Sequence, residues 1–195
     1  MPDGPGGAIE GYLFLGQVRR DSGRFDVVLS DCAFTTRRAA MRLLGLLRDF
    51  TTMGLTLSFA GGPCHPLVTL LPQQWTEMSF KDYWMIRIAH LERAIAARGY
   101  APGIAAETTI AVDDDLVPAN AGTWRLAVQN GSASASRTNS AAHFRCDIRT
   151  LAAIYSSFLS PRQAILLGMA EGDDHAAATL GAVFAGTAPW MPEQF

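Results

Sequence analysis

Residue types that mark several common classes of protein are scarce in this sequence of 195 residues. Lys81 is the only lysine and all other cationic side chains are arginines, a bias typical of a GC-rich bacterial genome. The formal net charge of −2 and the pI near 6.1 argue against nucleic acid as a main partner. No apolar run approaches the length that crosses a bilayer. We therefore expect a protein that contacts neither nucleic acid nor membrane.

Cysteine is also rare, and its number is odd. Cys32, Cys64 and Cys146 are widely spaced, which favours reduced thiols in a cytoplasm. Cys64 and His65 form the one close Cys/His pair, and the second pair that a zinc site needs is missing. The first seven residues have neither the charged start nor the apolar run of a signal peptide. These features predict a cytoplasmic protein without a bound metal.

The first half of the chain predicts strands that alternate with helices. Apolar residues at every second position indicate strands, and a stripe at helical spacing follows Thr35 or Thr36, either of which can cap a helix. His65 begins a short helical turn. The expected strands span residues 11–18, 24–34, 55–59 and 82–89, and the expected helices span residues 37–50 and 92–98.

The second half predicts several strands followed by three helices, the order of an α+β fold with segregated layers. Asn130-Gly131 is a strong hairpin signal, and Ser160-Pro161 is a typical helix start. We expect the loop over residues 113–121 to be cut early by proteases, because it is polar and lacks periodicity. The expected strands span residues 105–112, 122–128, 132–138 and 143–147, and the helices span residues 149–158, 161–168 and 174–185.

The C-terminal tail carries two aromatic anchors, Trp190 and Phe195, and the prolines Pro189 and Pro192. An apolar ring and the α-carboxylate of the chain share the last residue. If the ring docks in an apolar place, burial raises the pKa of that carboxylate from about 3.5 towards that of a useful base. Two interpretations stay open here: a tail that covers core, and a tail that carries a catalytic base.

Several segments resemble the Eis-like (enhanced intracellular survival) acetyltransferases. They are Gly11-Tyr12, residues 84–88 leading into 91–100, residues 122–126, and residues 182–184 followed by Ala188-Pro189-Trp190 and Phe195. Their order and spacing over residues 11–195 are similar to the C-terminal part of that family. The resemblance implies an α+β fold: a GNAT-like mixed sheet with helices over residues 1–86, then a sterol-carrier-protein-like sheet covered by helices over residues 87–195.

The resemblance also implies a reaction, the transfer of an acetyl group from acetyl-CoA to a primary amine. It makes the carboxylate of Phe195 the general base, with Trp84 and Trp190 as substrate-binding residues. The tyrosine that serves the family as general acid belongs to a module that this sequence lacks. His90 stands where the family usually has an acidic residue, which affects an expected domain contact and not the fold.

The coenzyme A signature of GNAT domains is a glycine-bearing turn whose backbone amides hold the pyrophosphate at a helix start. Residues 19–23 contain one glycine and precede a strand, and Pro63 removes an amide from the Gly61-Gly62-Pro63 turn. We therefore expect this chain to bind no cofactor, and acetyl-CoA to be held by a partner module. The expected protein partner is such an acetyltransferase module or, in a homo-oligomer, another copy of the chain.

Other functions stay open at this point. The chain is a split subunit, a fragment or a standalone relative, and as a standalone sterol-carrier-like module it would bind a small apolar ligand. A third possibility is another reaction with His65 or His90 as the acid–base group, although a helix cap is the simpler role for His90. His143 and His175 are expected on solvated surface, and the acidic run 113–115 is expected in a loop and not in a calcium site. We expect core packing more than a lipid cavity for the apolar helix residues Tyr155, Phe158, Ile165, Leu166, Met169, Leu180 and Phe184.

Overall fold

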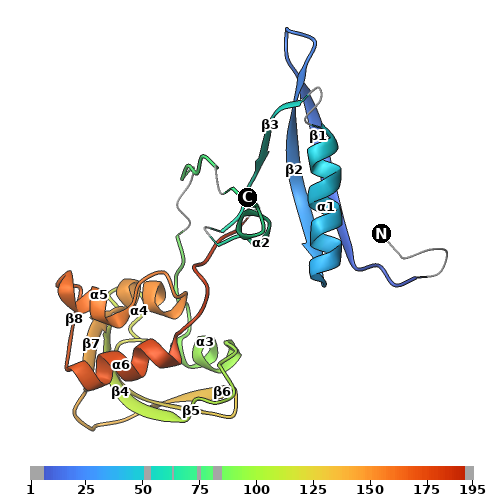
Figure 1. Ribbon diagram of the computed structural model, residues 1–195. Helices are drawn as coiled ribbons and strands as arrows, with labels where there is room; N and C mark the ends of the chain where they lie inside the picture. The colour runs from blue at the N-terminus through green and yellow to red at the C-terminus, as the bar shows by residue number, and fades with distance from the viewer. Residues whose placement is uncertain (1–6, 51–53, 63, 74–75, 81–84, 192–195) are drawn as a thin grey trace. The chain divides into compact units, whose positions relative to one another are not determined.

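The computed structural model describes residues 7–50, 54–62, 64–73, 76–80 and 85–191 (Figure 1). The chain divides into two compact units, one of residues 1–79 with 190–195, and one of residues 80–189. This division falls a few residues before the one expected at residue 86, and the end of the tail groups with the first unit. Each unit has its own sheet.

The N-terminal unit contains a three-stranded mixed sheet in the order β1-β2-β3. β1 (Gly11–Arg19) and β2 (Phe25–Phe34) are antiparallel, and β3 (Gly54–Phe59) runs parallel to β2. The turn between β1 and β2 uses Gly23 at a φ of 76°, a left-handed conformation that glycine adopts without strain. The helix α1 (Arg37–Asp49) supplies the crossover that the parallel pair β2–β3 requires.

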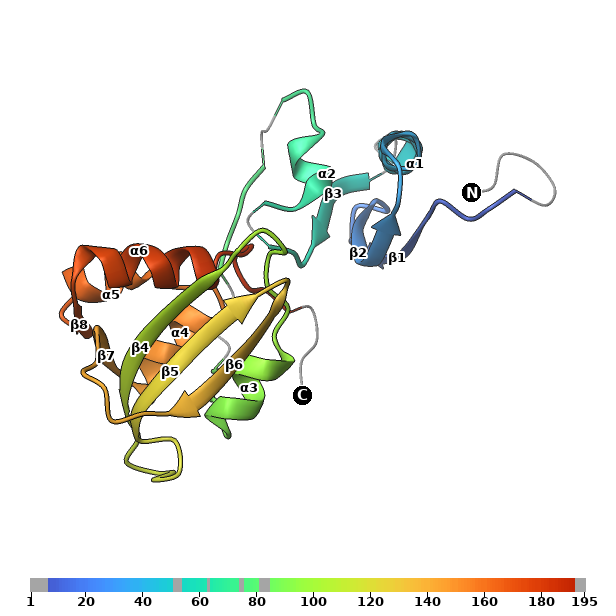
Figure 2. The same ribbon diagram turned by 90° about the horizontal axis from the view of Figure 1, so that it is seen from below.

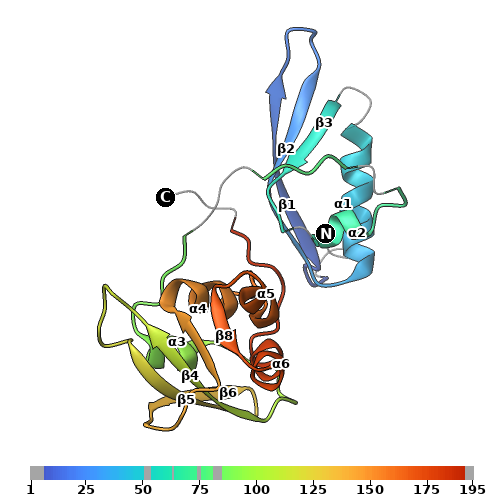
Figure 3. The same cartoon turned by 90° about the vertical axis from the view of Figure 1, so that its left-hand side faces the viewer.

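One face of this sheet is covered by α1, as Figure 3 shows. Thr36 caps the helix by accepting a hydrogen bond from the backbone N–H of Ala39, as the sequence predicted. Gly11 lets the helix approach closely, because a Cβ at this position would lie 3.3 Å from the Cβ of Ala39. The buried apolar residues of this layer are Val27, Leu29, Ala39, Ala40, Leu43 and Leu47.

The opposite face of the sheet is apolar and exposed. Tyr12 and Phe14 project from it with their rings 5.6 Å apart, and Val18 and Val28 are also exposed. A short helix, α2 (Pro66–Thr69), follows the sheet and begins at His65, as expected. The N-terminal unit is therefore one sheet with a single helical layer on one side, in the part of the chain that the structure describes.

The C-terminal unit contains a five-stranded sheet in the order β6-β5-β4-β7-β8. Neighbouring strands are antiparallel except β4 and β7, which run parallel. Asn130 and Gly131 join β5 to β6 with φ values of 52° and 79°, the conformation of a tight hairpin turn. The strands are β4 (Ala106–Asp113), β5 (Gly122–Gln129), β6 (Ser132–Arg137), β7 (Phe144–Asp147) and β8 (Ala170–Gly172).

Helices pack on one face of this sheet, as Figures 1 and 2 show. They are α3 (Leu91–Ala97), α4 (Ile148–Tyr155), α5 (Pro161–Leu166) and α6 (Asp174–Val183). Ser160 and Gln163 form a reciprocal capping box at the start of α5. The core between sheet and helices includes the fully buried residues Ile110, Leu126, Phe144, Leu151, Ile154 and Leu180. The fold class predicted from the sequence, α+β with mixed sheets and helices, is confirmed.

Two local expectations were wrong. No strand forms over residues 85–89, the described part of the segment 82–89, because the carbonyls of Ile88 and Ala89 accept hydrogen bonds from the Asn120 side chain. The short edge strand β8 was missed, since three residues are too few to show periodicity.

The helices of the described residues were also searched for membrane spans. None of them combines the length and the apolar character that crossing a bilayer demands.

Candidate functional site

The structure describes one of the three residues predicted to form the site. Phe195 and Trp84 lie outside the described residues. Trp190 is described, and its side chain is 49% exposed. Its ring meets the His65 ring edge-on at 6.3 Å, and a Cβ at Gly62 would lie only 2.8 Å from the indole. The tail of the chain therefore docks an aromatic ring on the turn around Gly62, within the N-terminal unit.

His65 is the centre of this small aromatic contact. Its ring lies 4.8 Å from that of Phe59, and burial lowers the pKa of the His65 imidazole. Nδ1 of His65 accepts a hydrogen bond from the backbone N–H of Leu67, so His65 caps α2. The His65 imidazole therefore caps α2 and packs against the Phe59 and Trp190 rings. These contacts explain the residue without a catalytic role.

A second polar centre lies where the tail leaves α6. The guanidinium of Arg98, just after α3, donates to the carbonyl of Tyr155 at 3.0 Å and to that of Phe184 at 3.2 Å. It also donates to the carbonyl of Val183 at 3.4 Å and to the hydroxyl of Ser157 at 3.3 Å. One half-buried side chain thus joins the ends of α3, α4 and α6.

Aromatic rings surround the same guanidinium. Its carbon lies 5.2 Å from the ring centre of Tyr100, 5.8 Å from that of Tyr155 and 5.4 Å from that of Phe184. These distances are within the range of cation–π attraction. Burial raises the pKa of the Tyr100 phenol to about 12, so this ring stays neutral beside the cation.

Ser157 completes this centre. It has a φ of 64°, a left-handed conformation that is uncommon for a residue other than glycine. Its hydroxyl donates to the carbonyl of Phe184 at 2.8 Å. Gly186 passes so close that a Cβ there would lie 2.6 Å from the Ser157 oxygen. Sequence reasoning missed Arg98 and Ser157, because an arginine at a helix end and a serine after a helix are ordinary surface residues.

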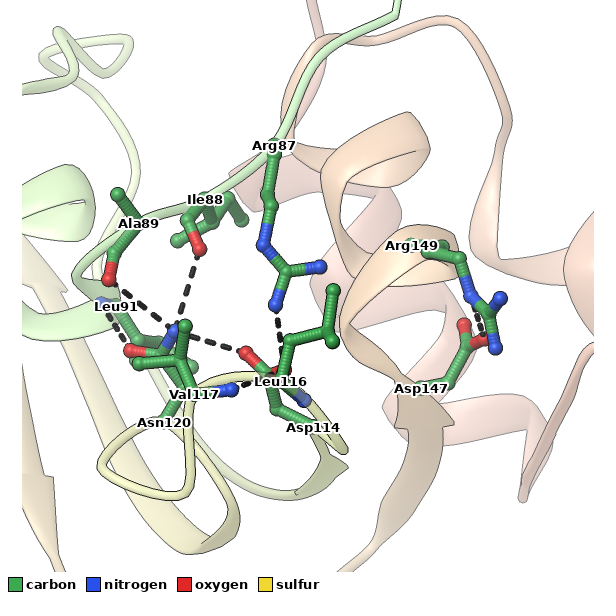
Figure 4. A network of polar contacts seen from close by, with 10 residues as sticks. All are labelled: Arg87, Ile88, Ala89, Leu91, Asp114, Leu116, Val117, Asn120, Asp147 and Arg149. Atoms are coloured by element: carbon green, nitrogen blue, oxygen red, sulfur yellow. Dashed lines mark hydrogen bonds and ion pairs between the residues drawn. The ribbon is translucent and has the colours of Figure 1, made fainter.

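A third polar network holds residues 87–91, which lead into α3 of the C-terminal unit (Figure 4). The amide of Asn120, which is 2% exposed, receives the backbone N–H of Leu91 and donates to the carbonyls of Ile88 and Ala89 and to Asp114. Asp114 also accepts from Arg87 at 2.6 Å. This network holds Asp114 and Asn120 in the loop over residues 113–121; early cleavage of this loop by proteases stays a prediction.

The carboxylate of Asp114 is fully enclosed, with a side chain 0% exposed. Burial alone would raise its pKa. Hydrogen bonds from Asn120, Arg87 and the backbone N–H groups of Val117 and Leu116 outweigh burial and lower the pKa of Asp114 to about 2. The residue is a structural anion and not a proton carrier at neutral pH. Figure 4 also shows Asp147, which caps α4 and pairs with Arg149.

The start of α1 (Arg37–Asp49) is a helix N-terminus, where free backbone amides could hold an anion. Here the Thr36 hydroxyl donates to the Glu10 carboxylate at 2.9 Å, and Arg38 pairs with the same carboxylate. An anionic side chain therefore already lies beside this helix start. A pocket of about 510 Å³ adjoins it, lined by Phe34, Thr35, Thr36, Arg37, Ala40, Cys64, Pro66, Thr69 and Leu70.

The other residues singled out from the sequence form a helix cap, lie on the surface or belong to the core. His90 caps α3, since its Nδ1 lies 3.5 Å from the backbone nitrogen of Arg93, and His143 and His175 are exposed. Among the apolar helix residues, Leu180 and Phe184 are core, whereas Phe158, Leu166 and Met169 are exposed by 66%, 84% and 46%. Within the described ranges, no three His, Cys, Asp or Glu side chains lie together as metal ligands require.

Solved structures resemble this chain over nearly its whole length. A GCN5-related N-acetyltransferase from Anabaena variabilis matches with a TM-score of 0.89 and 29% identity, covering 95% of this chain and 47% of that protein. One from Kribbella flavida matches with a TM-score of 0.81 and 26% identity, covering 94% and 46%. Eis1 from Mycobacterium abscessus has the same fold, with a TM-score of 0.77 and 23% identity, covering 95% and 48%.

The chain therefore spans about half the length of the solved proteins that it matches. No curated protein matched the sequence. The family model of the sterol carrier protein domain matches residues 91–192, just over half of the chain. This range begins at the first residue of α3 and includes the whole five-stranded sheet and its helices. The chain belongs to the sterol carrier protein domain family.

Proposed function

We propose that this chain is the non-coenzyme-binding portion of an Eis-like N-acetyltransferase. In the complete assembly, an acetyl-CoA-binding module supplies the coenzyme, and the C-terminal carboxylate of Phe195 is the general base. That module is a separate acetyltransferase domain. The acceptor is a primary amine, bound beside Trp84 and Trp190.

The likeness to the Anabaena variabilis N-acetyltransferase carries this proposal. It extends over 95% of the chain at 29% identity, so it includes both units. Because this chain corresponds to 47% of that protein, acetyl transfer by the whole protein is inferred for an assembly and not for the chain alone.

The hydrogen bonds at the start of α1 support the proposal that another module binds the coenzyme. A pyrophosphate needs free backbone amides and positive potential at a helix N-terminus. At α1, the side chain of Thr36 accepts from the N–H of Ala39 and its hydroxyl binds Glu10. The carboxylate of Glu10 would repel a phosphate group at this position. We therefore expect the N-terminal unit to have no affinity for acetyl-CoA.

The proposed chemistry needs one base near the acceptor amine. The Phe195 carboxylate takes a proton from the ammonium or from the attacking amine, the amine nitrogen forms a bond to the acetyl carbonyl carbon, and the carbon–sulfur bond breaks. The coenzyme leaves as its thiolate and is protonated by an acid of the other module. Docking of the neighbouring Trp190 ring against His65 limits where the last residues of the chain can reach.

Reconstitution tests the proposal. The chain is titrated with acetyl-CoA by calorimetry, then combined with the other half of the Anabaena variabilis protein, separately or as a fusion, and supplied with an aliphatic primary amine. We expect no binding by the chain alone and release of coenzyme A only from the combination. A stoichiometric micromolar complex with the isolated chain contradicts the proposal, as does an inactive assembly that native mass spectrometry shows to be intact.

The family match favours a second candidate, a module that carries a small apolar ligand. The interior of the C-terminal unit argues for a weak or shallow site, since the rings of Tyr155 and Phe184 pack 6.2 Å apart against the buried Leu180. Native mass spectrometry of the purified chain distinguishes the two functions: a co-purifying apolar molecule supports this candidate, and a bound protein module supports the first.

A further inference from the structure

The end of α6 is held by more contacts than a helix end needs. A C-terminal helix normally frays, and its last carbonyls are satisfied by water or by a single cap. Here the carbonyl of Phe184 accepts both from Arg98 and from Ser157, and the carbonyl of Val183 accepts from Arg98 as well. Directly afterwards, residues 185–190 are exposed and have no regular structure.

We propose that Arg98 and Ser157 form a clamp that fixes the point and the direction in which the C-terminal tail leaves the C-terminal unit, which makes Arg98 a positioning residue for the tail. The proposal rests on the proposed function only for its catalytic consequence. The clamp itself is a property of the isolated chain.

The geometry of Arg98 suits this role. A guanidinium is a planar, rigid group with five N–H donors, so it can bind several carbonyls at once and stack on rings. Its partners come from α4 and α6 and lie 57 to 86 residues away in the sequence. The Phe184 ring, 3% exposed and 5.4 Å from the Arg98 carbon, anchors the residue whose carbonyl is clamped. Backbone and side chain of Phe184 are thus both fixed.

The conformation of Ser157 is a second, independent observation. Glycine is the usual residue at this position after a helix, because a left-handed φ strains most residues that carry a Cβ. Ser157 accepts this strain, and its hydroxyl bonds to Phe184 and Arg98. The contact with Gly186 also excludes any larger residue there. Strain of this kind points to a role other than stability of the helix end.

The clamp matters because the tail is long and exposed. A change of direction at Phe184 alters the path along which residues 185–189 lead to the docked Trp190, and a misplacement of about 1 Å at a reacting group can reduce a rate by about 100-fold. In the proposed assembly, the clamp therefore sets the position from which the Phe195 carboxylate reaches the acceptor amine.

Backbone ¹⁵N relaxation of the full chain tests the clamp directly. In Arg98→Met, which keeps the apolar stem but not the donors, we expect the order parameters of Gly186 and Thr187 to fall from about 0.85 to below about 0.6. In Ser157→Gly, the same residues become mobile while the melting temperature stays equal or rises, since strain is relieved. The matched control is Arg137→Met, which removes an arginine stacked on Trp124 at 4.0 Å, and it leaves the tail unchanged.

Unchanged order parameters at Gly186 and Thr187 in Arg98→Met overturn the proposal. So does mobility that spreads equally through the whole C-terminal unit, because Arg98 would then be a general stabilising residue. In the reconstituted assembly, Arg98→Met should lower kcat by up to about 100-fold with an unchanged KM for acetyl-CoA. An inactive wild-type assembly refutes the proposed function and leaves the relaxation result intact, so the two failures are distinguishable.

Discussion

The two units of this chain differ in how completely they bury their own apolar residues. The C-terminal unit has helices over one face of a five-stranded sheet, and its other face carries polar pairs such as Glu107–Arg125. The N-terminal unit has a helix on one face, while Tyr12, Phe14, Val18 and Val28 remain exposed on the other. Over the residues that the structure describes, the C-terminal unit encloses its core, and the N-terminal unit leaves an apolar face of its sheet exposed.

The largest effect that this comparison predicts is seen when the units are separated. Expressed alone, residues 80–189 should unfold in one cooperative thermal transition, because their core is enclosed by their own residues. Residues 1–79 alone should show no cooperative transition, since a single helical layer buries little apolar area. Circular dichroism melts of both fragments measure this. A sharp transition for residues 1–79 would show that the N-terminal unit is complete by itself.

The polar network of the C-terminal unit should be sensitive to a single amide. Asn120→Ala removes four hydrogen bonds and leaves the N–H of Leu91, two carbonyls and Asp114 without this partner. We expect a loss of about 3 kcal/mol in the free energy of unfolding. The control Asn139→Ala changes an exposed asparagine and should stay within about 0.5 kcal/mol. Equal urea midpoints for the two variants would contradict the role given to Asn120.

Replacing Trp190, whose ring docks in the N-terminal unit, should reduce stability less than replacing Asn120. The ring is 49% exposed and contacts His65 and Gly62, so Trp190→Ala should reduce stability by about 1 kcal/mol. Chemical denaturation monitored by circular dichroism gives the value. Phe158→Ala, which changes a ring 66% exposed in the other unit, is the control and should have less effect. A loss above about 3 kcal/mol would indicate a far more enclosed ring.

The smallest predicted effect is on the pH dependence of stability, and it arises from Asp114. Its pKa is about 2 in the folded chain, below the ordinary value of 3.8, so its contribution to stability is complete above about pH 4 and disappears as the pH falls towards 2. Stability should therefore fall over this window, and in Asp114→Asn the number of protons taken up on acid unfolding should be lower by up to one. The same pH slope in both proteins would contradict the low pKa.

Local chemistry made much of the fold predictable. The hairpin at Asn130-Gly131, the helix start at Ser160-Pro161 and the cap at Thr36, one of two threonine candidates, depend on residues within a few positions of one another, and all three formed. Long-range pairing was not predictable in the same way. The Asn120 side chain holds Ile88 and Ala89 from about 30 residues away, and this non-local contact replaced the strand that the apolar run predicted.

The candidate site shows the same contrast. The sequence singled out Trp190 because an aromatic residue in a terminal tail is unusual, and its ring does dock. Arg98 and Ser157 carry no local signal, since their meaning arises only where α3, α4 and α6 end together. Functional roles for Phe195, Trp84 and Trp190 remain proposals that the activity assay tests.

The most direct test of the account is the addition of one glycine after Phe195. The extension moves the terminal charge by roughly 3.8 Å, the spacing of successive Cα atoms, and leaves both units unchanged. We predict an unchanged melting temperature and a loss of acetyl transfer of at least about 100-fold in the reconstituted assembly. Full activity of the extended chain would remove the carboxylate from the mechanism and leave the tail with a packing role alone.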